Sequence, residues 1–244
     1  MIARTLTVMA VLASGGLFVG ALYWGLLNTP EANALTVSLS ALLVITILVA
    51  LAVTVNTAIL TAQGVAQRDA VRRATRGIGW FVLALIPLVL AWVAIIRGDR
   101  WIAEHQGEIN AWFIARFGWA DISRLLQAEA WTSQWLRWTV VPVACLSLLA
   151  ARLGATHAAR GAWLRRALHW RTLFADLAVF VLLFALPWRL TAWRPQLPPT
   201  WVEPTVAAIR LATFALLALG GAAVLILFAA RDRTSRQTAR GGVE

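Results

Sequence analysis

The sequence contains no lysine, one cysteine and three histidines, and each shortage excludes a class of site. Without lysine, the chain cannot carry a phosphate-binding loop of the GK[ST] type. The single cysteine, Cys145, has no partner for a disulfide or a dithiol redox cycle, and its apolar surroundings predict a buried, unreactive thiol. Long apolar runs separate His105 from His157 and His169, so we predict no metal site and no cofactor.

Signatures of catalysis are also missing. The chain has no G-x-S-x-G sequence, and no histidine lies within the long apolar runs. We therefore predict no catalytic residue and no enzyme. The alternative is an enzyme that acts on lipid headgroups with acidic catalytic residues. The candidate acids lie on predicted helices that also carry arginines, a pattern typical of a solvated helix face. These acids are Glu104, Glu108, Asp121 and Glu129.

Apolar residues dominate the chain. Hydrophobic residues make up 60% and charged residues 14%, and the mean hydropathy is +0.73. Several uncharged runs are long enough to cross a bilayer as helices. We predict an all-α integral membrane protein, one polytopic domain over residues 1–244. The six transmembrane helices of this bundle are expected at about 5–27, 35–60, 78–96, 138–152, 172–189 and 205–229.

The first apolar run has a second interpretation. Ala32-Asn33-Ala34 resembles the small-x-small site that follows a signal peptide. The run is longer than the apolar part of a typical signal peptide, which favours a retained helix.

Residues 97–137 differ from the spans because five arginines and five acids alternate there with aromatic residues. We predict an extracytoplasmic amphipathic segment in the membrane interface, with helices over about 100–116 and 122–136. Gly118 should break the two helices, and Asp121 is a candidate N-cap. The fourth span is expected to continue from the second of these helices, with Arg137 at the boundary and a kink at Pro142.

The arginines indicate an orientation. With six spans, one side of the membrane holds 14 arginines and four acids, a net charge of +10, while the other holds eight arginines and seven acids, a net charge of +1. The positive-inside rule then places both termini in the cytoplasm and the chain in the inner (plasma) membrane. Five spans would move the basic residues 152–171 outside, against this rule. Eleven of the 14 tryptophans fall on the outer side, which indicates an aromatic outer surface.

Two sets of residues are predicted to make contacts. The first set, aromatic and basic, is expected to bind lipid headgroups or partner proteins: Trp112, Trp131, Trp135, Trp188, Arg189, Trp193, Arg194 and Arg210. The second set consists of small residues that let helices approach, within the chain or from another subunit: Gly16, Gly20, Gly220 and Gly221. Asp176 is interpreted as a residue near the inner boundary, too far from Arg210 to pair with it.

These features favour a non-catalytic subunit of a bacterial-type inner-membrane complex, which scaffolds or anchors partner subunits. Its expected partners are membrane lipids and other membrane-protein subunits. The alternative is the membrane permease component of a transporter or exporter of lipid or polysaccharide precursors, working with a separate ATPase. Nucleic acid is excluded as a partner because the arginines flank apolar runs and do not form one basic face.

Overall fold

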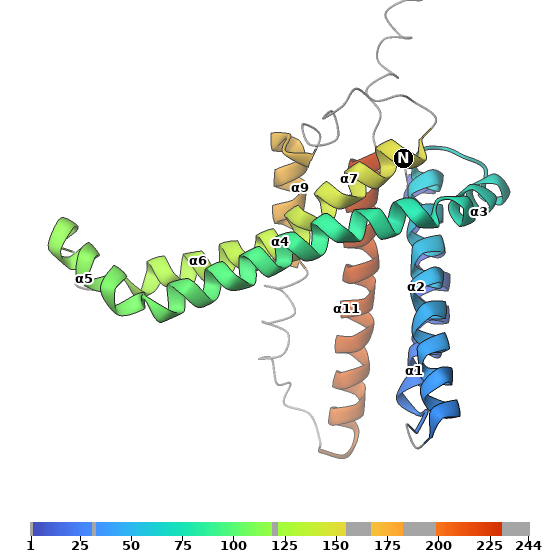
Figure 1. Ribbon diagram of the computed structural model, residues 1–244, viewed down its shortest axis with the longest axis horizontal. Helices are drawn as coiled ribbons and strands as arrows, with labels where there is room; N and C mark the ends of the chain where they lie inside the picture. Colours follow the sequence, from blue (N-terminus) through green and yellow to red (C-terminus); the bar gives the residue numbers. More distant parts are fainter. Residues whose placement is uncertain (1, 31–32, 119–121, 155–166, 183–198, 231–244) are drawn as a thin grey trace, which may run out of the picture.

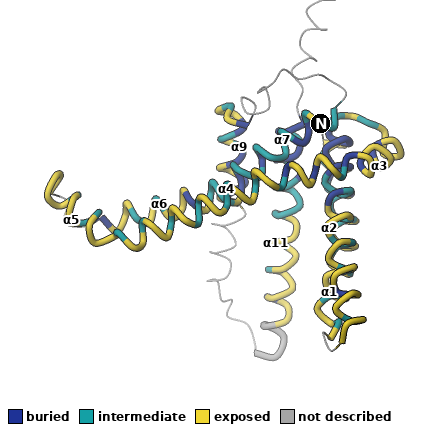
Figure 2. Tube along the Cα trace, in the orientation of Figure 1, coloured by how far each residue is buried: buried dark blue, intermediate teal, exposed yellow. Residues whose placement is uncertain are grey.

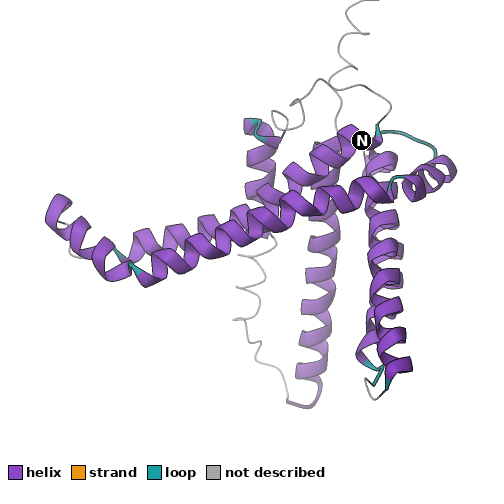
Figure 3. Ribbon diagram, viewed as in Figure 1, coloured by secondary structure: helices purple, strands orange, loops and turns teal. Residues whose placement is uncertain are grey.

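The computed structural model describes residues 2–30, 33–118, 122–154, 167–182 and 199–230, with the backbone alone for 199–203. Within these ranges the chain is helical and contains no strand (Figure 3). The described helices are α1 (Ile2–Leu27), α2 (Ala34–Ala62), α3 (Gln67–Arg76), α4 (Ile78–Glu104), α5 (Gln106–Phe117), α6 (Ser123–Trp135), the π-helical turn η1 (Leu136–Val140), α7 (Val141–Leu153), α9 (Trp170–Phe180) and α11 (Pro199–Ala230).

Five helical stretches in the described ranges are long and apolar enough to cross a membrane: Ile2–Leu27, Ala34–Ala62, Ile78–Glu104, Ser123–Leu153 and Pro204–Ala230. The all-α class is therefore confirmed, with apolar helices suited to a membrane. The fourth stretch joins α6, η1 and α7 without a break, as expected for a span that continues the preceding helix. Helix α9 covers the first part of the predicted span 172–189, and residues 183–189 lie outside the described ranges.

The predicted helix boundaries between 96 and 123 need correction. Helix α4 continues to Glu104, eight residues past the predicted end of the third span, and the helix predicted from about residue 100 begins at Gln106. Contacts of α4 with α6 account for the extra turns, as described below. The predicted break at Gly118 is confirmed, because this glycine ends α5 with a φ of 66°. The predicted cap, Asp121, lies outside the described residues.

The helices converge at one end of the molecule. The start of α1, the end of α2, the start of α4 and the ends of α7 and α11 lie together there, with α3 beside them (Figure 1). Buried residues gather at this end, whereas the far parts of α1, α2 and α11 are exposed (Figure 2). The main core cluster is rich in alanine, which permits close backbone approach, and includes Val8, Ala52, Ala58, Ile59, Phe81, Ala84, Leu149, Ala150, Ala223 and Ile226.

Side-chain amides join the helices at this core. The Asn56 Nδ2 of α2 donates to the carbonyl of Ala74 in α3 at 3.1 Å. The Gln63 Nε2, just beyond α2, donates to the carbonyl of Ala150 in α7 at 2.9 Å. Both carbonyls lie in the last turns of their helices and also accept a backbone N–H, that of Gly77 at Ala74 and that of Gly154 at Ala150, so each amide adds a second hydrogen bond. These bonds therefore fix α3 and α7 against the end of α2.

Helices α1 and α2 lie side by side as an antiparallel hairpin (Figure 1). Asn33 and Thr36 form a reciprocal capping box that starts α2. A Cβ atom on Gly15 would lie 2.2 Å from the Thr54 Oγ1, so only glycine permits this approach. Gly16, by contrast, has no neighbouring atom within 4 Å of its Cβ position.

A second hairpin extends away from the other helices. We call it the arm and define it as α4 from Trp92 onward, α5 and α6. It runs across the direction of α1, α2 and α11 (Figure 1), and most of its residues are exposed (Figure 2). Helix α5, at the tip, contains no buried residue.

The two neighbouring glycines of α1 give a matched test of the hairpin. Gly15→Ala should lower the stability by about 1–3 kcal/mol, because the new methyl group collides with Thr54. Gly16→Ala should raise it by about 0.5–1 kcal/mol, because alanine favours the helix and meets no neighbour. Thermal unfolding in detergent measures both, and equal effects at the two positions would contradict the described α1–α2 packing.

Candidate functional site

At the base of the arm, the helix that joins α6 to α7 departs from regular α-helical hydrogen bonding. The Val141 N–H bonds to the carbonyl of Leu136, five residues earlier, which is the π-helical register. One residue further on, that register would pair the carbonyl of Arg137 with the N–H of residue 142. Pro142 has no N–H, so the Arg137 carbonyl needs a partner from another helix.

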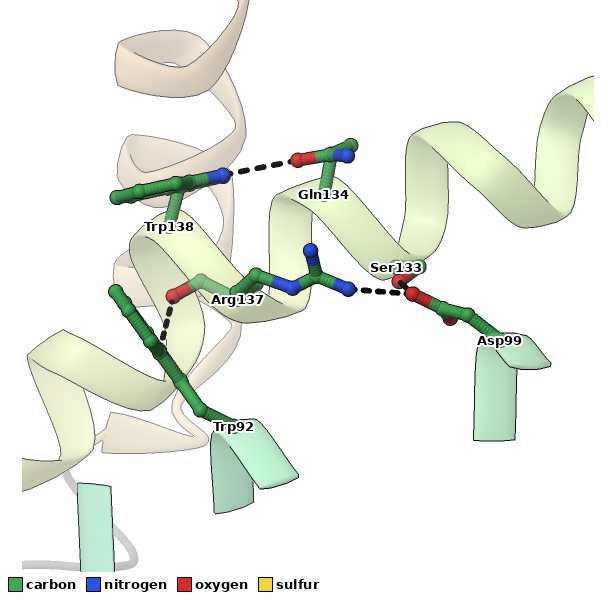
Figure 4. Close-up of polar contacts among 6 residues, drawn as sticks. All are labelled: Trp92, Asp99, Ser133, Gln134, Arg137 and Trp138. Atoms are coloured by element: carbon green, nitrogen blue, oxygen red, sulfur yellow. Dashed lines mark hydrogen bonds and ion pairs between the residues drawn. The ribbon is translucent and has the colours of Figure 1, made fainter. Parts of the chain in front are cut away.

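Trp92 of α4 supplies that partner. Its Nε1 donates to the Arg137 carbonyl at 2.9 Å. The Trp92 ring also meets the Trp138 ring edge to face, with centroids 5.1 Å apart. The Trp138 Nε1 in turn donates to the Gln134 Oε1 at 2.9 Å (Figure 4). A backbone group that Pro142 leaves unpaired is thus satisfied across the helix–helix contact.

The side chain of Arg137 makes the second contact across the arm. Its guanidinium forms an ion pair with the Asp99 carboxylate of α4 (Figure 4). The Ser133 hydroxyl of α6, which is buried, lies 2.7 and 2.9 Å from the two oxygens of the same carboxylate. The Arg137 side chain is 17% exposed and that of Asp99 36% exposed, so the pair is partly shielded from water. We call Trp92, Asp99, Ser133 and Arg137 the clamp.

Beyond the clamp, the two helices of the arm enclose an apolar groove. It has a volume of about 460 Å³ and opens to the outside of the molecule. Its walls come from α4 and from α6 with η1, and Asp99 is one of the lining residues. The lining residues are Ile95, Gly98, Asp99, Ile102, Leu125, Ala128, Glu129, Thr132, Ser133 and Leu136. The groove suits a hydrocarbon side chain or acyl chain, because most of its lining is apolar and one of its two carboxylates, Asp99, is already engaged by the clamp.

Aromatic residues occupy the tip and the base of the arm. Trp112, Phe113 and Phe117 of α5 form one group with ring centroids 5.0 to 5.7 Å apart, in which Trp112 and Phe117 are exposed and Phe113 is half-buried. At the base, Trp131 of α6 contacts Phe180 of α9 edge to face at 5.8 Å. In the described residues, no group of three or more His, Cys, Asp or Glu side chains is placed to hold a metal ion.

The residues predicted to contact lipids or partners are only partly brought together. Trp112 lies at the tip of the arm, whereas Trp131 and Trp135 lie near its base. Arg210 is half-buried on α11, away from the arm. The other four, Trp188, Arg189, Trp193 and Arg194, lie outside the described residues.

Three of the four glycines predicted to pack helices lie at positions that the rest of the described chain leaves open. Gly16 and Gly20 have no neighbouring atom within 4 Å of their Cβ positions, and neither has Gly220. Gly221 follows Gly220 on α11 and is half-buried. The close contact inside the chain is made by Gly15. The prediction that these glycines approach another subunit stays a prediction.

Sequence reasoning missed the clamp, although the sequence contains a signal for it. Asp99 lies 19 residues before Gly118, and Arg137 lies 19 residues after it. In an antiparallel hairpin that turns at Gly118, these two opposite charges face each other. Arg137 was instead expected to extend toward the membrane surface. Arg137 pairs with Asp99 because a partly buried guanidinium is stabilised more by a carboxylate within reach than by headgroups at a distance.

Removing the indole donor should weaken the base of the arm. Trp92→Phe keeps the ring contact with Trp138 but leaves the Arg137 carbonyl without its partner. We expect a loss of about 1–2 kcal/mol in the free energy of unfolding. The matched control is Trp101→Phe, an exposed tryptophan of the same helix, which should change stability by less than about 0.5 kcal/mol. Thermal unfolding in detergent measures both, and equal losses would contradict the role of the indole.

A double-mutant cycle measures the ion pair. Asp99→Ala and Arg137→Ala should each destabilise the protein, and the coupling between them should be about 1–3 kcal/mol. The exposed acid at the end of the same helix is the control, and Glu104→Ala should show no coupling with Arg137→Ala. A coupling near zero for Asp99 and Arg137 would show that the pair does not hold the arm.

Comparison of the chain with models of protein families, with curated proteins and with solved structures gives no match. The site that the structure offers is the arm, a braced helical hairpin with an apolar groove along it and aromatic side chains at its tip.

Proposed function

We propose that the chain is a non-catalytic integral subunit of a bacterial-type inner-membrane complex, which anchors a partner subunit through the arm. The clamp is the observation that supports this proposal. It stabilises a hairpin that extends beyond the other helices and exposes an apolar groove and an aromatic tip. Packing within this chain alone does not require such an extension.

The architecture of the arm supports a docking role in two ways. Its two helices are fixed by an ion pair and an indole hydrogen bond at the base, so a partner meets a preformed surface. The groove between them is apolar and open, and its dimensions suit bulky aliphatic or aromatic side chains of a partner helix. The exposed rings of Trp112 and Phe117 would extend this contact at the tip.

The helices outside the arm offer a second face. Leu17 is 77% exposed on α1, beside the open positions of Gly16 and Gly20. In a bilayer, lipid covers such a surface without cost, but small residues also let a partner helix approach closely. We propose that this face of α1 receives lipid or a second helix of the complex.

In the proposed orientation, the converging helix ends lie on the cytoplasmic side, and the arm extends from them across the direction of α1, α2 and α11 (Figure 1). Helix α3 supports this arrangement because it lies beside the converging ends (Figure 1) and its arginines are exposed. Ala70 and Ala74 are buried against the core while the basic side chains face outward, an arrangement suited to anionic headgroups. The four arginines of this helix are Arg68, Arg72, Arg73 and Arg76.

One observation favours the alternative, a permease component that works with a separate ATPase. Helix α3 is a short helix docked across the end of α2, with a polar face that is free of other described helices. A soluble ATPase could engage such an element. The arm has no evident role in this alternative, and for that reason we prefer the scaffold.

Photo-crosslinking tests the arm as a docking site. Benzoylphenylalanine at Ile102, a groove residue, should give one discrete protein adduct in intact membranes. The same group at Leu211, an exposed residue of α11, is the control and should label lipid. Arg137→Ala should lower the yield from position 102 by about tenfold, the effect of losing about 1.4 kcal/mol of preorganisation, with the amount of chain unchanged.

The outcomes separate the proposals. A single adduct that depends on the clamp supports the scaffold, and an ATPase as the co-purifying partner would replace it with the permease. A chain that gives no protein adduct at position 102, and that purifies as a monomer with its own enzymatic activity, would overturn both.

A further inference from the structure

Asp176 is an exception among the acidic side chains that the structure describes. It is the only one with no exposed surface, and neither carboxylate oxygen has a hydrogen-bond partner. Buried carboxylates in proteins are ordinarily paired or hydrogen-bonded, because an ionised group without a partner is strongly unfavourable away from water. An ionisable group within a membrane segment is also a candidate for function.

The surroundings of Asp176 come from three packed elements. Val179 of α9 forms a cluster with Val143 of α7 and Leu225 of α11. Asp176 lies one turn before Val179, and Ser147 lies one turn after Val143. Asp176 and Ser147 therefore each lie within about one helical turn of this cluster, on two of the helices that it joins. The Ser147 side chain has no exposed surface, and its hydroxyl also has no hydrogen-bond partner.

The arginines on the elements around Asp176 are placed elsewhere. Arg137 of η1 is paired with Asp99, and Arg152 of α7 lies over the Trp80 ring at 5.1 Å. Arg171 of α9 lies over the Trp170 ring, also at 5.1 Å. Arg210 precedes Leu225 by 15 residues on α11, about 22 Å along the helix. The remaining titratable groups on or beside these elements in the described ranges are Cys145, His169 and Glu203, the last at the start of α11 and 22 residues before Leu225.

We propose that Asp176, together with the Ser147 hydroxyl, binds a single monovalent cation, a proton or Na⁺, between α7, α9 and α11. Bound charge of +1 neutralises the carboxylate and removes the penalty of burying it. Carboxylate and hydroxyl oxygens are hard ligands, suited to either cation. This binding site goes beyond the proposed function, because anchoring a partner requires no cation.

Labelling with dicyclohexylcarbodiimide tests the proposal on the full-length chain in detergent, since this reagent modifies protonated carboxyls in apolar surroundings. Trypsin releases the peptide 172–189, in which Asp176 is the only acidic side chain. The peptide 125–137 is the internal control, because its only acid is the partly exposed Glu129. We expect the Asp176 peptide to be labelled at neutral pH in sodium-free buffer and the Glu129 peptide to remain unmodified.

Two titrations identify the cation. Labelling should fall about tenfold for each pH unit above the midpoint of the site. If Na⁺ is the physiological occupant, sodium chloride should protect Asp176 while choline chloride at the same ionic strength should not. If the occupant is a proton alone, both salts should leave the rate unchanged. An Asp176 peptide that stays unlabelled from acidic to neutral pH without sodium would overturn the proposal.

The substitution Asp176→Asn provides an independent measurement. The amide keeps the shape of the neutral carboxyl, so the variant should unfold at the wild-type temperature or above it, and its melting temperature should not respond to sodium. A marked fall in melting temperature at every pH would indicate that the wild-type carboxylate is held by a permanent cation such as an arginine. That outcome would overturn the proposal even if labelling were weak.

Discussion

The missing N–H of Pro142 is the constraint on which the base of the arm depends. A proline within a continuous helix removes one backbone donor, and in an apolar environment the carbonyl left behind must find another. Here the chain shifts into the π register, and the indole of Trp92 replaces the lost donor. The guanidinium of Arg137 reaches Asp99 from the same turn. The missing N–H therefore fixes the position of α4 through Trp92. The same turn places Arg137 against Asp99, the one ion pair of the arm among the described residues.

At the converging end the controlling factor is small side-chain volume. Ala58, Ala74 and Ala150 have almost no exposed surface, and Gly77 approaches both Leu153 and Asn56. Close backbone approach lets amide side chains reach carbonyls in the last turns of α3 and α7, which accept these hydrogen bonds in addition to their backbone bonds. Large apolar side chains dominate the exposed surfaces farther from this end. Tight packing is thus confined to one end, and the rest of the apolar surface is left for lipid or partners.

The sequence predicted those features that depend on local chemistry. Apolar runs located the long helices, and Gly118 marked a helix end because glycine readily adopts a positive φ. It did not predict features that depend on pairing between distant segments. The last turns of α4 are held by Ser133 of α6 and Arg137 of η1, and the complete burial of Asp176 depends on packing of α9 against elements distant in the sequence. The predicted contacts at Trp188, Arg189, Trp193 and Arg194 lie outside the described residues.

The clamp and the proposed cation site meet at one element. The turn η1 contacts α4 through the carbonyl of Arg137 and packs against α9 on another side. Phe180, one turn beyond Asp176, contacts Trp131 at the base of the arm. A charge left on Asp176 would favour a shift of α9 toward water, and α9 can shift only by disturbing this ring contact and η1. Binding of a cation and the position of the arm are therefore expected to be linked, and by thermodynamic reciprocity a partner bound to the arm would alter cation affinity by the same factor.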